Sequence, residues 1–339
     1  MRDGHGRTID YLRISLTDRC NLRCIYCMPE DGVVQATHDE ILRIEEIARV
    51  VEVAAGCGIR RVRLTGGEPL VRRGVLELVR DVAGTPGIEE VSLTTNGVLL
   101  PQMAADLREA GLSRVNISLD TLDPVQFSYI TRRGHLDDVM AGIGAALDAG
   151  LAPVKLNCVA VRSLGQDFAA FARLSVERPL HVRFIEYMPV GHSVGVDGAG
   201  WTQDDSIPAD ELRAIIDEGL AAQGLPALEP LDDAEAPGGA GPARYWKIPD
   251  AAGTVGFISG MSDHFCGECN RLRLTADGKL RPCLFSDDEL DLRAALRAAG
   301  SDDEREAGVR RALEEAIGAK PEEHGGETET QRDMSRIGG

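Results

Sequence analysis

The 339-residue sequence predicts an α/β fold, an incomplete (βα)6 parallel barrel followed by a C-terminal α+β region. Three observations lead to this prediction. Between Asp10 and Glu186, short runs rich in β-branched residues alternate with longer amphipathic segments. Several of the helical segments end at a glycine, as at Gly111 and Gly150, where a C-cap is expected. Beyond Tyr187 the alternation ends, and turns, short strands and cysteines follow.

The first half supplies the strands and helices of the barrel. The expected strands are, in chain order, Tyr11–Thr17, Arg61–Thr65, Glu90–Thr95, Arg114–Leu119, Val154–Val161 and His181–Ile185. The expected helices between them are Glu45–Gly56, Gly74–Ala83, Pro101–Ala110, Asp137–Ala149 and Gln166–Val176. Strands that are joined through helices pair in parallel, and right-handed crossovers curl such a sheet toward a barrel. Six units fall short of the eight of a closed barrel.

The second half of the chain lacks the regular alternation of strand and helix patterns. After the Gly-rich stretch Val190–Gly200, we expect a helix, an acidic low-complexity loop, short strands, two more helices and a polar tail. The first helix is Ile207–Leu220, the acidic loop is Asp232–Pro242, and the short strands are Val255–Ile258 and Leu272–Thr275. The two later helices are Leu290–Ala298 and Glu306–Ile317, and the tail is Ala319–Gly339. The expected domains are therefore 1–189 for the barrel, 190–318 for a C-terminal region with its own cysteine group, and 319–339 for a flexible tail.

Charge and composition exclude several partners. The 37 basic and 55 acidic side chains give a formal net charge of −18, and no basic stripe suited to nucleic acid is present. The N-terminus lacks the apolar core of a signal peptide, and no run approaches the roughly twenty apolar residues of a membrane span. We therefore expect a cytoplasmic protein with neither nucleic acid nor a membrane as partner. Its eight cysteines are expected to be ligands, catalytic groups or buried thiols rather than disulfides.

Three of these cysteines form a tight group directly after the first strand. Cys20, Cys24 and Cys27 are spaced C-x3-C-x2-C, so their thiols converge on one side of a short loop. A structural zinc site is one interpretation, but it requires four closed ligands, and the loop contains no fourth cysteine or histidine. A 4Fe-4S cluster held by three thiolates keeps one iron open for a small molecule, and the spacing favours this interpretation.

The loop resembles that of the radical S-adenosylmethionine superfamily, which has an aromatic residue, here Tyr26, before the last cysteine. The segment Gly66-Gly67-Glu68-Pro69 resembles the GGEP segment of the same superfamily. The resemblance implies that S-adenosylmethionine binds the open iron and that an electron from the cluster releases a 5'-deoxyadenosyl radical. Two glycines allow close approach of backbone to a ligand, and Glu68 offers an acceptor for an ammonium group. A glycine pair here is also a common strand-to-helix turn.

A second cysteine group lies in the C-terminal region. Cys266 and Cys269 form a C-x2-C pair, and Cys283 follows thirteen residues later. His264 stands nearby and could complete a zinc site, since such pairs are common in zinc knuckles. From the residues alone, both zinc and a second iron–sulfur cluster remain open.

Taken with the first loop, the second group resembles the GTP 3',8-cyclase family of molybdenum cofactor biosynthesis. Further segments that fit this family are Arg183–Met188, Asn270–Leu274, Ala276–Lys279 and the terminal Gly338-Gly339. The resemblance implies two 4Fe-4S clusters, S-adenosylmethionine, and cyclisation of GTP to (8S)-3',8-cyclo-7,8-dihydroguanosine 5'-triphosphate. It also implies an electron donor such as a flavodoxin or ferredoxin, a downstream pterin-forming enzyme, and a monomer or homodimer. The double glycine would then enter the active site.

Several charged residues on the expected strands are candidates for holding a triphosphate. Arg13, Arg63, Lys155 and Arg183 are flanked by apolar strand residues, so each is costly unless it lines a cavity or forms a buried ion pair. The resemblance assigns GTP contacts to Arg13, Arg63, Thr94, Lys155, Arg183, Arg271, Leu272 and Arg273. It assigns S-adenosylmethionine contacts to Tyr26, Gly67, Ser118 and Met188. The chain has no P-loop, which disfavours an ordinary GTPase.

Two other functions remain as alternatives. One is a different two-cluster radical enzyme that matures peptides, although such enzymes are expected to have more cysteines near the C-terminus. The other is a zinc-stabilised binding protein without catalysis. Iron content and colour of the anaerobically purified protein discriminate between them.

Overall fold

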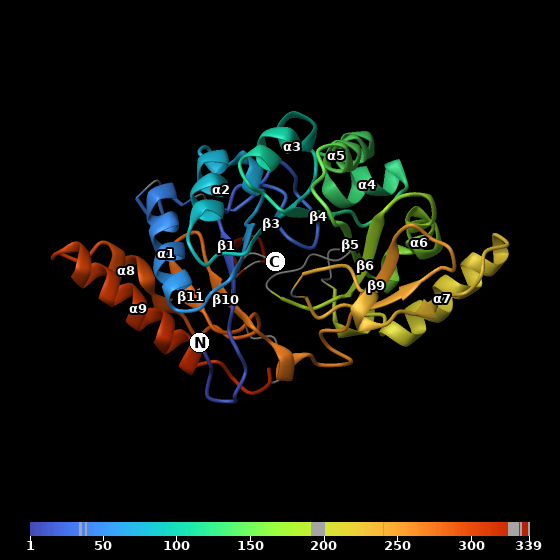
Figure 1. The fold of residues 1–339 in the computed structure, drawn as a ribbon. Coiled ribbons are helices and arrows are strands. Elements are labelled where there is room, and N and C mark those ends of the chain that lie inside the picture. The colour runs from blue at the N-terminus through green and yellow to red at the C-terminus, as the bar shows by residue number, and fades with distance from the viewer. Residues whose placement is uncertain are drawn as a thin grey trace.

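The computed structural model describes residues 1–33, 36–37, 39–190, 201–239, 241–324, 332 and 334–337. In these residues twelve strands form one sheet in the order β12-β11-β10-β1-β2-β3-β4-β5-β6-β9-β8-β7. The sheet is curved and open (Figure 1). Strand β12 forms one edge and β7 the other. This is the incomplete barrel that the sequence predicts.

The six predicted strands form the centre of the sheet, and every neighbouring pair is parallel. They are β1 (Tyr11–Ser15), β2 (Arg61–Thr65), β3 (Glu90–Thr95), β4 (Arg114–Ser118), β5 (Val154–Ala160) and β6 (Leu180–Glu186). Successive side chains of a strand point to opposite faces of the sheet, which explains why these strands carry both apolar and charged residues. On β1, Leu12 and Ile14 lie in the hydrophobic core, whereas Tyr11 and Arg13 face an internal cavity.

The C-terminal region extends this sheet at both ends. Its strands are β7 (Glu229–Pro230), β8 (Arg244–Lys247), β9 (Thr254–Ile258), β10 (Arg271–Leu274), β11 (Lys279–Arg281) and β12 (Leu290–Asp291). Strand β9 pairs with β6 in parallel, and β10 pairs with β1 in parallel. The outer strands on each side are antiparallel. The region that contains the second cysteine group therefore lies beside the first strand of the barrel.

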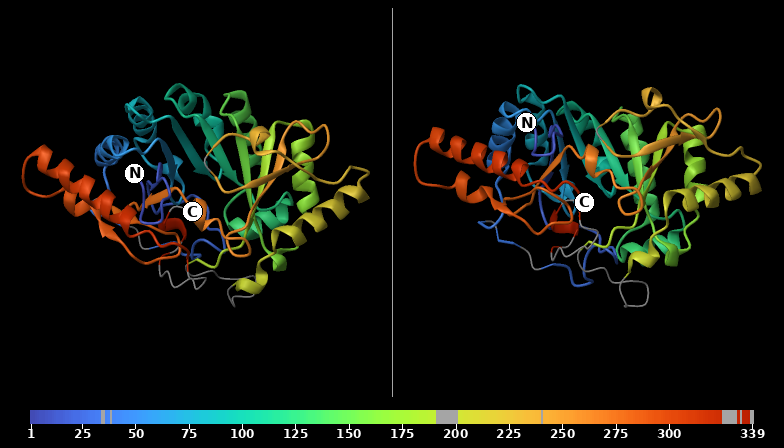
Figure 2. Two further views of the ribbon diagram at one scale, coloured as in Figure 1. Left: turned by 60° about the horizontal axis from the view of Figure 1, so that its bottom comes forward. Right: turned by 90° about the horizontal axis from the view of Figure 1, so that it is seen from below.

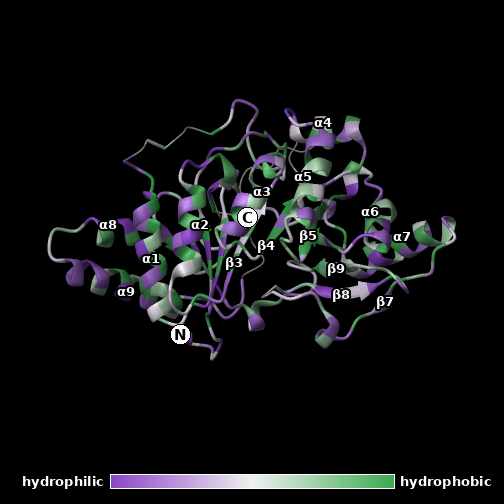
Figure 3. Cartoon of the chain, turned by 45° about the horizontal axis from the view of Figure 1, so that its top comes forward, coloured by the Kyte–Doolittle hydropathy of each residue, from purple (hydrophilic) through white to green (hydrophobic). Residues whose placement is uncertain are grey.

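Helices cover the outer face of the sheet (Figures 1 and 2). They are α1 (Ile44–Gly56), α2 (Val75–Gly84), α3 (Leu100–Glu109), α4 (Pro124–Thr131), α5 (Leu136–Asp148), α6 (Phe168–Glu177), α7 (Ala209–Ala222), α8 (Leu292–Leu296) and α9 (Asp302–Gly318). The short helix α10 (Met334–Ile337) lies on the inner side, where Met334 lines a cavity. In α3, the residues Leu100, Ala104 and Leu107 are buried, which gives one apolar stripe toward the sheet. Figure 3 shows hydrophobic strands beneath helices whose outer turns are largely hydrophilic.

Some elements differ from the sequence prediction. Helix α4 is not expected from periodicity, yet Asp123 caps it by accepting a hydrogen bond from the Gln126 backbone, and Pro124 occupies its first turn. The segment predicted as a helix over Leu290–Ala298 begins as strand β12 and becomes helical only at Leu292. No helix in the described part of the chain is long and apolar enough to cross a membrane.

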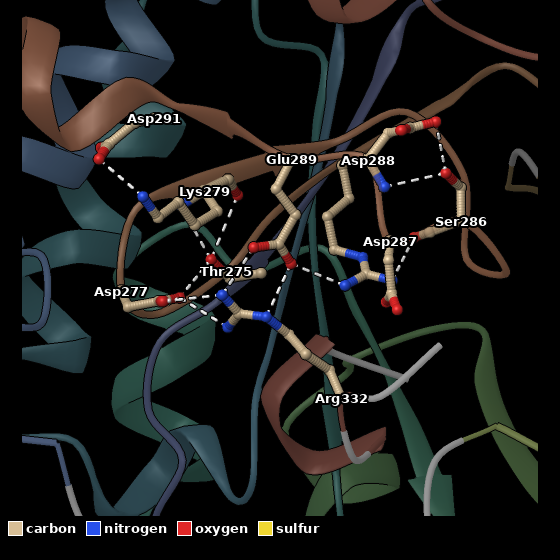
Figure 4. Close-up of polar contacts among 10 residues, drawn as sticks. Thr275, Asp277, Lys279, Ser286, Asp287, Asp288, Glu289, Asp291 and Arg332 are labelled. Atoms are coloured by element: carbon tan, nitrogen blue, oxygen red, sulfur yellow. Dashed lines mark hydrogen bonds and ion pairs between the residues drawn. The ribbon is translucent and has the colours of Figure 1, made fainter. Parts of the chain in front are cut away.

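The described part of the tail packs against the body of the protein. Lys320 is buried, and Ile337 in α10 is also buried. Arg332 donates to both Asp277 and Glu289, at 3.0 and 2.7 Å, and this network is drawn in Figure 4. The terminal Gly338-Gly339, whose entry into the active site the resemblance implies, lies outside the described residues.

Candidate active site

One cavity inside the curved sheet is lined by both cysteine groups. The first group follows β1, and the second group immediately precedes β10, the parallel neighbour of β1. The two groups therefore lie toward opposite ends of the same pair of strands. A five-residue strand is about 17 Å long, and this strand pair separates the two groups. None of these six cysteines forms a disulfide, and they are Cys20, Cys24, Cys27, Cys266, Cys269 and Cys283.

The first thiol group sits in a loop that local hydrogen bonds shape. The Cys27 and Met28 backbones donate to the Cys24 carbonyl, which closes a tight turn. The Cys20 sulfur accepts from the Leu22 backbone at 3.3 Å and from Asn96 Nδ2 at 3.8 Å. Burial raises the pKa of Cys24 well above its usual value, and the Cys27 thiol and Asp120 raise it further. Burial also raises the pKa of Cys20, and a bound metal group would supply the positive charge that stabilises thiolates here.

Tyr26 fastens this loop to the end of β4. Its hydroxyl donates to Asp120 Oδ2 at 2.6 Å, and Asp120 Oδ1 accepts from the Val159 backbone at 2.9 Å. Burial raises the pKa of Asp120 to about 6, although both hydrogen bonds oppose the shift. The Tyr26 ring also stacks on Trp201, with 5.6 Å between centroids. These contacts hold the ring against the cavity.

The glycine pair after β2 is required by close backbone packing. A Cβ on Gly67 would lie 2.3 Å from the Arg19 carbonyl oxygen, and Gly66 has a φ of +141°. Both glycines line the cavity, but Glu68 is fully buried. Its carboxylate accepts from the Leu70 and Asn96 backbones and from Thr95 Oγ1. These contacts turn the carboxylate toward the protein, and the expectation that Glu68 accepts from a ligand's ammonium group stays a prediction. Burial raises its pKa to about 7.

Three arginines lie abreast on neighbouring strands between the two thiol groups. Arg13 on β1 is in register with Arg63 on β2 and with Arg273 on β10, and all three line the cavity. Burial and the neighbouring arginines lower the pKa of Arg13 well below its usual value. Burial lowers the pKa of Arg63 to about 9 and that of Arg273 to about 10. Such a concentration of buried positive charge suits a polyanionic ligand.

The buried ion pair, which the sequence leaves open as an alternative for the strand arginines, is formed in the described part of the chain by Arg114 and not by Arg13 or Arg63. Arg114 Nη2 lies 2.7 Å from Glu90 Oε1, whereas within the described residues neither Arg13 nor Arg63 has a carboxylate partner. Arg63 instead donates to Ser92 Oγ at 3.3 Å and lies over the Tyr11 ring. The Nε atom of Arg13 is buried without a hydrogen-bond partner in the described structure. An unsatisfied buried donor of this kind indicates a missing ligand.

Arg183 and Lys155 stand on β6 and β5. Arg183 lines the cavity, and its Nε and Nη2 donate to Asn157 Oδ1. Lys155 is buried, and its Nζ donates to the Pro237 and Gly238 carbonyl oxygens at 3.3 and 2.7 Å. Burial and then Arg183 lower the pKa of Lys155 to about 6. The acidic loop therefore covers Lys155 and separates it from the cavity.

The structure brings most of the predicted site residues together. The cavity is lined by Arg13, Tyr26, Arg63, Gly67, Thr94, Ser118, Arg183, Met188, Arg271 and Arg273, besides the six cysteines. Lys155 lies behind the loop, and the Leu272 side chain is buried in the core. Sequence reasoning missed Tyr11 and Asn157, which alternation along β1 and β5 could have revealed. It also missed His324 and Met334, for which the polar tail gives no signal.

The second thiol group has a more cationic environment than the first. Although burial alone raises the pKa of Cys269, Lys320 and Arg271 hold it below its usual value. His264, the candidate fourth zinc ligand, directs Nδ1 at the Gly260 carbonyl oxygen and packs edge-on against His324. Among the described residues, no group of three His, Cys, Asp or Glu side chains could hold a single metal ion. Three cysteines of each group line the cavity, which is the number of protein ligands that a 4Fe-4S cluster with an open iron requires.

Comparisons with known proteins agree with this site. The Radical SAM superfamily model matches residues 14–174, and the Molybdenum Cofactor Synthesis C model matches residues 180–326. The crystal structure of Streptococcus suis SuiB bound to precursor peptide SuiA covers 90% of this chain and 67% of its own, with a TM-score of 0.59 and 13% identity. SuiB bound to S-adenosylmethionine gives a TM-score of 0.54 at 13% identity, with 90% and 66% covered. Fold and cysteine loop thus define a radical S-adenosylmethionine enzyme with a 4Fe-4S cluster.

Relatives of similar length narrow the class further. The GTP 3',8-cyclase of Pelotomaculum thermopropionicum is 52% identical over 342 residues, and that of Moorella thermoacetica is 51% identical over 342 residues. Each alignment covers 100% of both chains. The chain belongs to the GTP 3',8-cyclase family, and the predicted fold and activity are confirmed.

Proposed function

We propose that this chain cyclises GTP to (8S)-3',8-cyclo-7,8-dihydroguanosine 5'-triphosphate, the first step of molybdenum cofactor biosynthesis. The observation that carries the proposal is the single cavity with a thiol group at each end and a row of buried arginines between them. This arrangement provides one place for a radical source, one for a purine base and one for a triphosphate. The full-length identity to GTP 3',8-cyclases supports the same reaction.

At one end, Cys20, Cys24 and Cys27 would hold the radical-generating cluster. When bound, that cluster and S-adenosylmethionine would supply the radical chemistry that abstracts a hydrogen from the ribose. Tyr26, Gly67, Ser118 and Met188 would contact S-adenosylmethionine, since all four line this cavity. The Tyr26 to Asp120 bond keeps the loop rigid, which orients the reacting groups and excludes water.

At the other end, Cys266, Cys269 and Cys283 would hold a second 4Fe-4S cluster that orients the guanine. Three thiols line the cavity here as well, and the His264 imidazole already has other partners. The same C-terminal region, 190–318, would form the cluster-binding domain after a barrel of 1–189 and before a tail of 319–339, whose described part packs against the body.

Between the two ends, buried cations would hold GTP. Arg13, Arg63 and Arg273 form a row across three strands, and Arg183 and Thr94 line the same space. Arg271 and Leu272 belong to the strand that follows the second thiol group, so the backbone of this strand would border the base. The Lys155 ammonium would exchange its hydrogen bonds to the Pro237 and Gly238 carbonyl oxygens for hydrogen bonds to oxygens of the triphosphate.

The remaining parts of the proposal concern partners and location. A flavodoxin or ferredoxin would donate the electrons, and a pterin-forming enzyme would receive the product. The protein would act in the cytoplasm as a monomer or homodimer. The cysteines of both groups form no disulfide, which supports a reducing compartment.

The test is anaerobic incubation of reconstituted protein with GTP, S-adenosylmethionine and dithionite. We expect 5'-deoxyadenosine and a cyclised nucleotide in parallel. The variant Cys269→Ser should lose the cyclised nucleotide, whereas Cys57→Ser, whose thiol contacts Arg310 outside the cavity, should behave as the parent. Parent-rate cyclisation by Cys269→Ser would show that the second thiol group has no catalytic role.

A further inference from the structure

One buried lysine joins the segments that carry the second thiol group. Lys320 follows α9 and is only 4% exposed. Its Nζ donates to the Cys269 sulfur at 3.7 Å, to the Arg271 carbonyl oxygen at 2.8 Å and to the Pro282 carbonyl oxygen at 2.8 Å. Arg271 begins the strand after Cys269, and Pro282 directly precedes Cys283. A single side chain therefore ties the two segments together and touches a proposed cluster ligand.

The number of hydrogen-bond acceptors around Lys320 Nζ indicates the protonation state of this side chain. An ammonium group has three donors, and a neutral amine has two. Lys320 has three acceptors in place, so the ammonium satisfies all of them. Lys155 offers a contrast, because its Nζ has two carbonyl acceptors. Lys320 thus places a full positive charge against the sulfur of Cys269, in a buried site where charges interact strongly.

The neighbouring chain holds Lys320 in place. The Lys320 carbonyl oxygen contacts His5 Nε2 at 3.1 Å. Arg7 donates to the Pro321 carbonyl oxygen at 2.6 Å and to the Cys266 carbonyl oxygen at 2.7 Å. Arg7 is itself paired with Asp3 at 2.6 Å, and both side chains are nearly inaccessible to solvent. The N-terminal segment and the segment after α9 therefore brace the second thiol group from the side away from the first.

We propose that Lys320 is a positioning residue for the second 4Fe-4S cluster, which fixes the Cys269 and Cys283 segments and raises the cluster's reduction potential. The inference rests on the proposed second cluster. Reduction adds negative charge to a cluster, so a nearby cation and a hydrogen bond to a ligating sulfur favour the reduced state. The first cluster should be unaffected, because among the described residues the Lys320 Nζ atom donates only to the segments that carry the second thiol group.

The experiment compares Lys320→Met, Lys320→Arg and the control Lys279→Met in the anaerobically reconstituted holoenzyme. Lys279 lies at the start of β11, the strand that leads to Pro282 and Cys283, but it donates to Asp291 instead of a cysteine segment. Iron content is measured first, and each cluster is then titrated potentiometrically with detection by electron paramagnetic resonance. The second cluster's signal is the one that persists in a Cys24→Ser variant. We expect a more negative midpoint for the second cluster in Lys320→Met, with the first cluster unchanged.

Lys320→Arg should stay closer to the parent because it keeps the charge, and Lys279→Met should match the parent. An unchanged second midpoint in a Lys320→Met protein with about eight irons overturns the inference and leaves the proposed function intact. Only about four irons in the parent would instead overturn the second cluster itself. Selective loss of the second cluster in folded Lys320→Met supports the positioning role. If Lys320→Met does not fold, Lys320→Gln replaces it, and the same midpoint comparison decides.

Discussion

Replacing Arg63 by Met should stabilise the ligand-free protein and abolish its response to GTP. Arg63 is buried beside other arginines and has no carboxylate partner within the described residues. Burial lowers its pKa from 12.5 to about 9, which corresponds to a cost of about 5 kcal/mol for the charge in the folded state. Because the folded pKa of this base is depressed, the cost is present at neutral pH and falls only as the pH rises above about 9.

The net gain is smaller than this cost, because the variant loses the contact with the Tyr11 ring and the hydrogen bond to Ser92. Replacing a buried charge by an apolar side chain of similar size stabilises proteins by about 1–4 kcal/mol. At roughly 2 °C for each kcal/mol in a chain of this size, the melting temperature should rise by about 2–8 °C.

The assay is thermal unfolding of cluster-free protein with and without GTP, followed by circular dichroism. Arg114→Met is the matched control, because Arg114 is equally buried but is paired with Glu90. Removing Arg114 leaves a carboxylate without its partner, so this variant should be destabilised. A less stable Arg63→Met protein that keeps the parent's GTP-induced rise in melting temperature would refute the reasoning.

Three further predictions follow from individual contacts. GTP binding at pH 7.5 should be accompanied by proton uptake, because the triphosphate raises the pKa of Lys155 from about 6. Calorimetry of GTP binding in two buffers of different ionisation enthalpy measures this uptake, and Lys155→Met should reduce it. Uptake as large in Lys155→Met as in the parent would contradict this. Gly67→Ala should lower 5'-deoxyadenosine formation about a hundredfold, since its Cβ would meet the Arg19 carbonyl oxygen, whereas Gly144→Ala, in open space, should not. Tyr26→Phe should cost about 1–3 kcal/mol in urea unfolding, because buried Asp120 loses a donor; unchanged stability would disprove the role of this bond.

The sequence predicts the six central strands well because their alternation is strong and each is bounded by clear turns. Arg61–Thr65 and Glu90–Thr95 agree residue for residue with β2 and β3. The added strands β9 and β10 were expected only as short strands of a separate region. Their pairing with β6 and β1 is decided by tertiary contacts, which local pattern does not encode. Helix α4 was missed because its apolar residues have no clear stripe.

The candidate site was predictable where residue type and spacing carry the signal. The two cysteine groups and the arginines on β1 and β2 are of this kind, since a charge among apolar strand residues requires a cavity or a partner. The position of the second group was not predictable from the rule that ligands bind at the carboxyl ends of strands, because it precedes β10. Lys320 is one lysine in a polar tail, and only the fold places it against Cys269.

The central claim is that GTP lies between the two thiol groups with its ribose toward Cys20, Cys24 and Cys27. The most direct test is a single anaerobic turnover with S-adenosylmethionine and GTP that carries deuterium at C3', followed by mass spectrometry of the 5'-deoxyadenosine. The account predicts 5'-deoxyadenosine that contains one deuterium from the nucleotide. Cyclised nucleotide accompanied by 5'-deoxyadenosine without deuterium would contradict it.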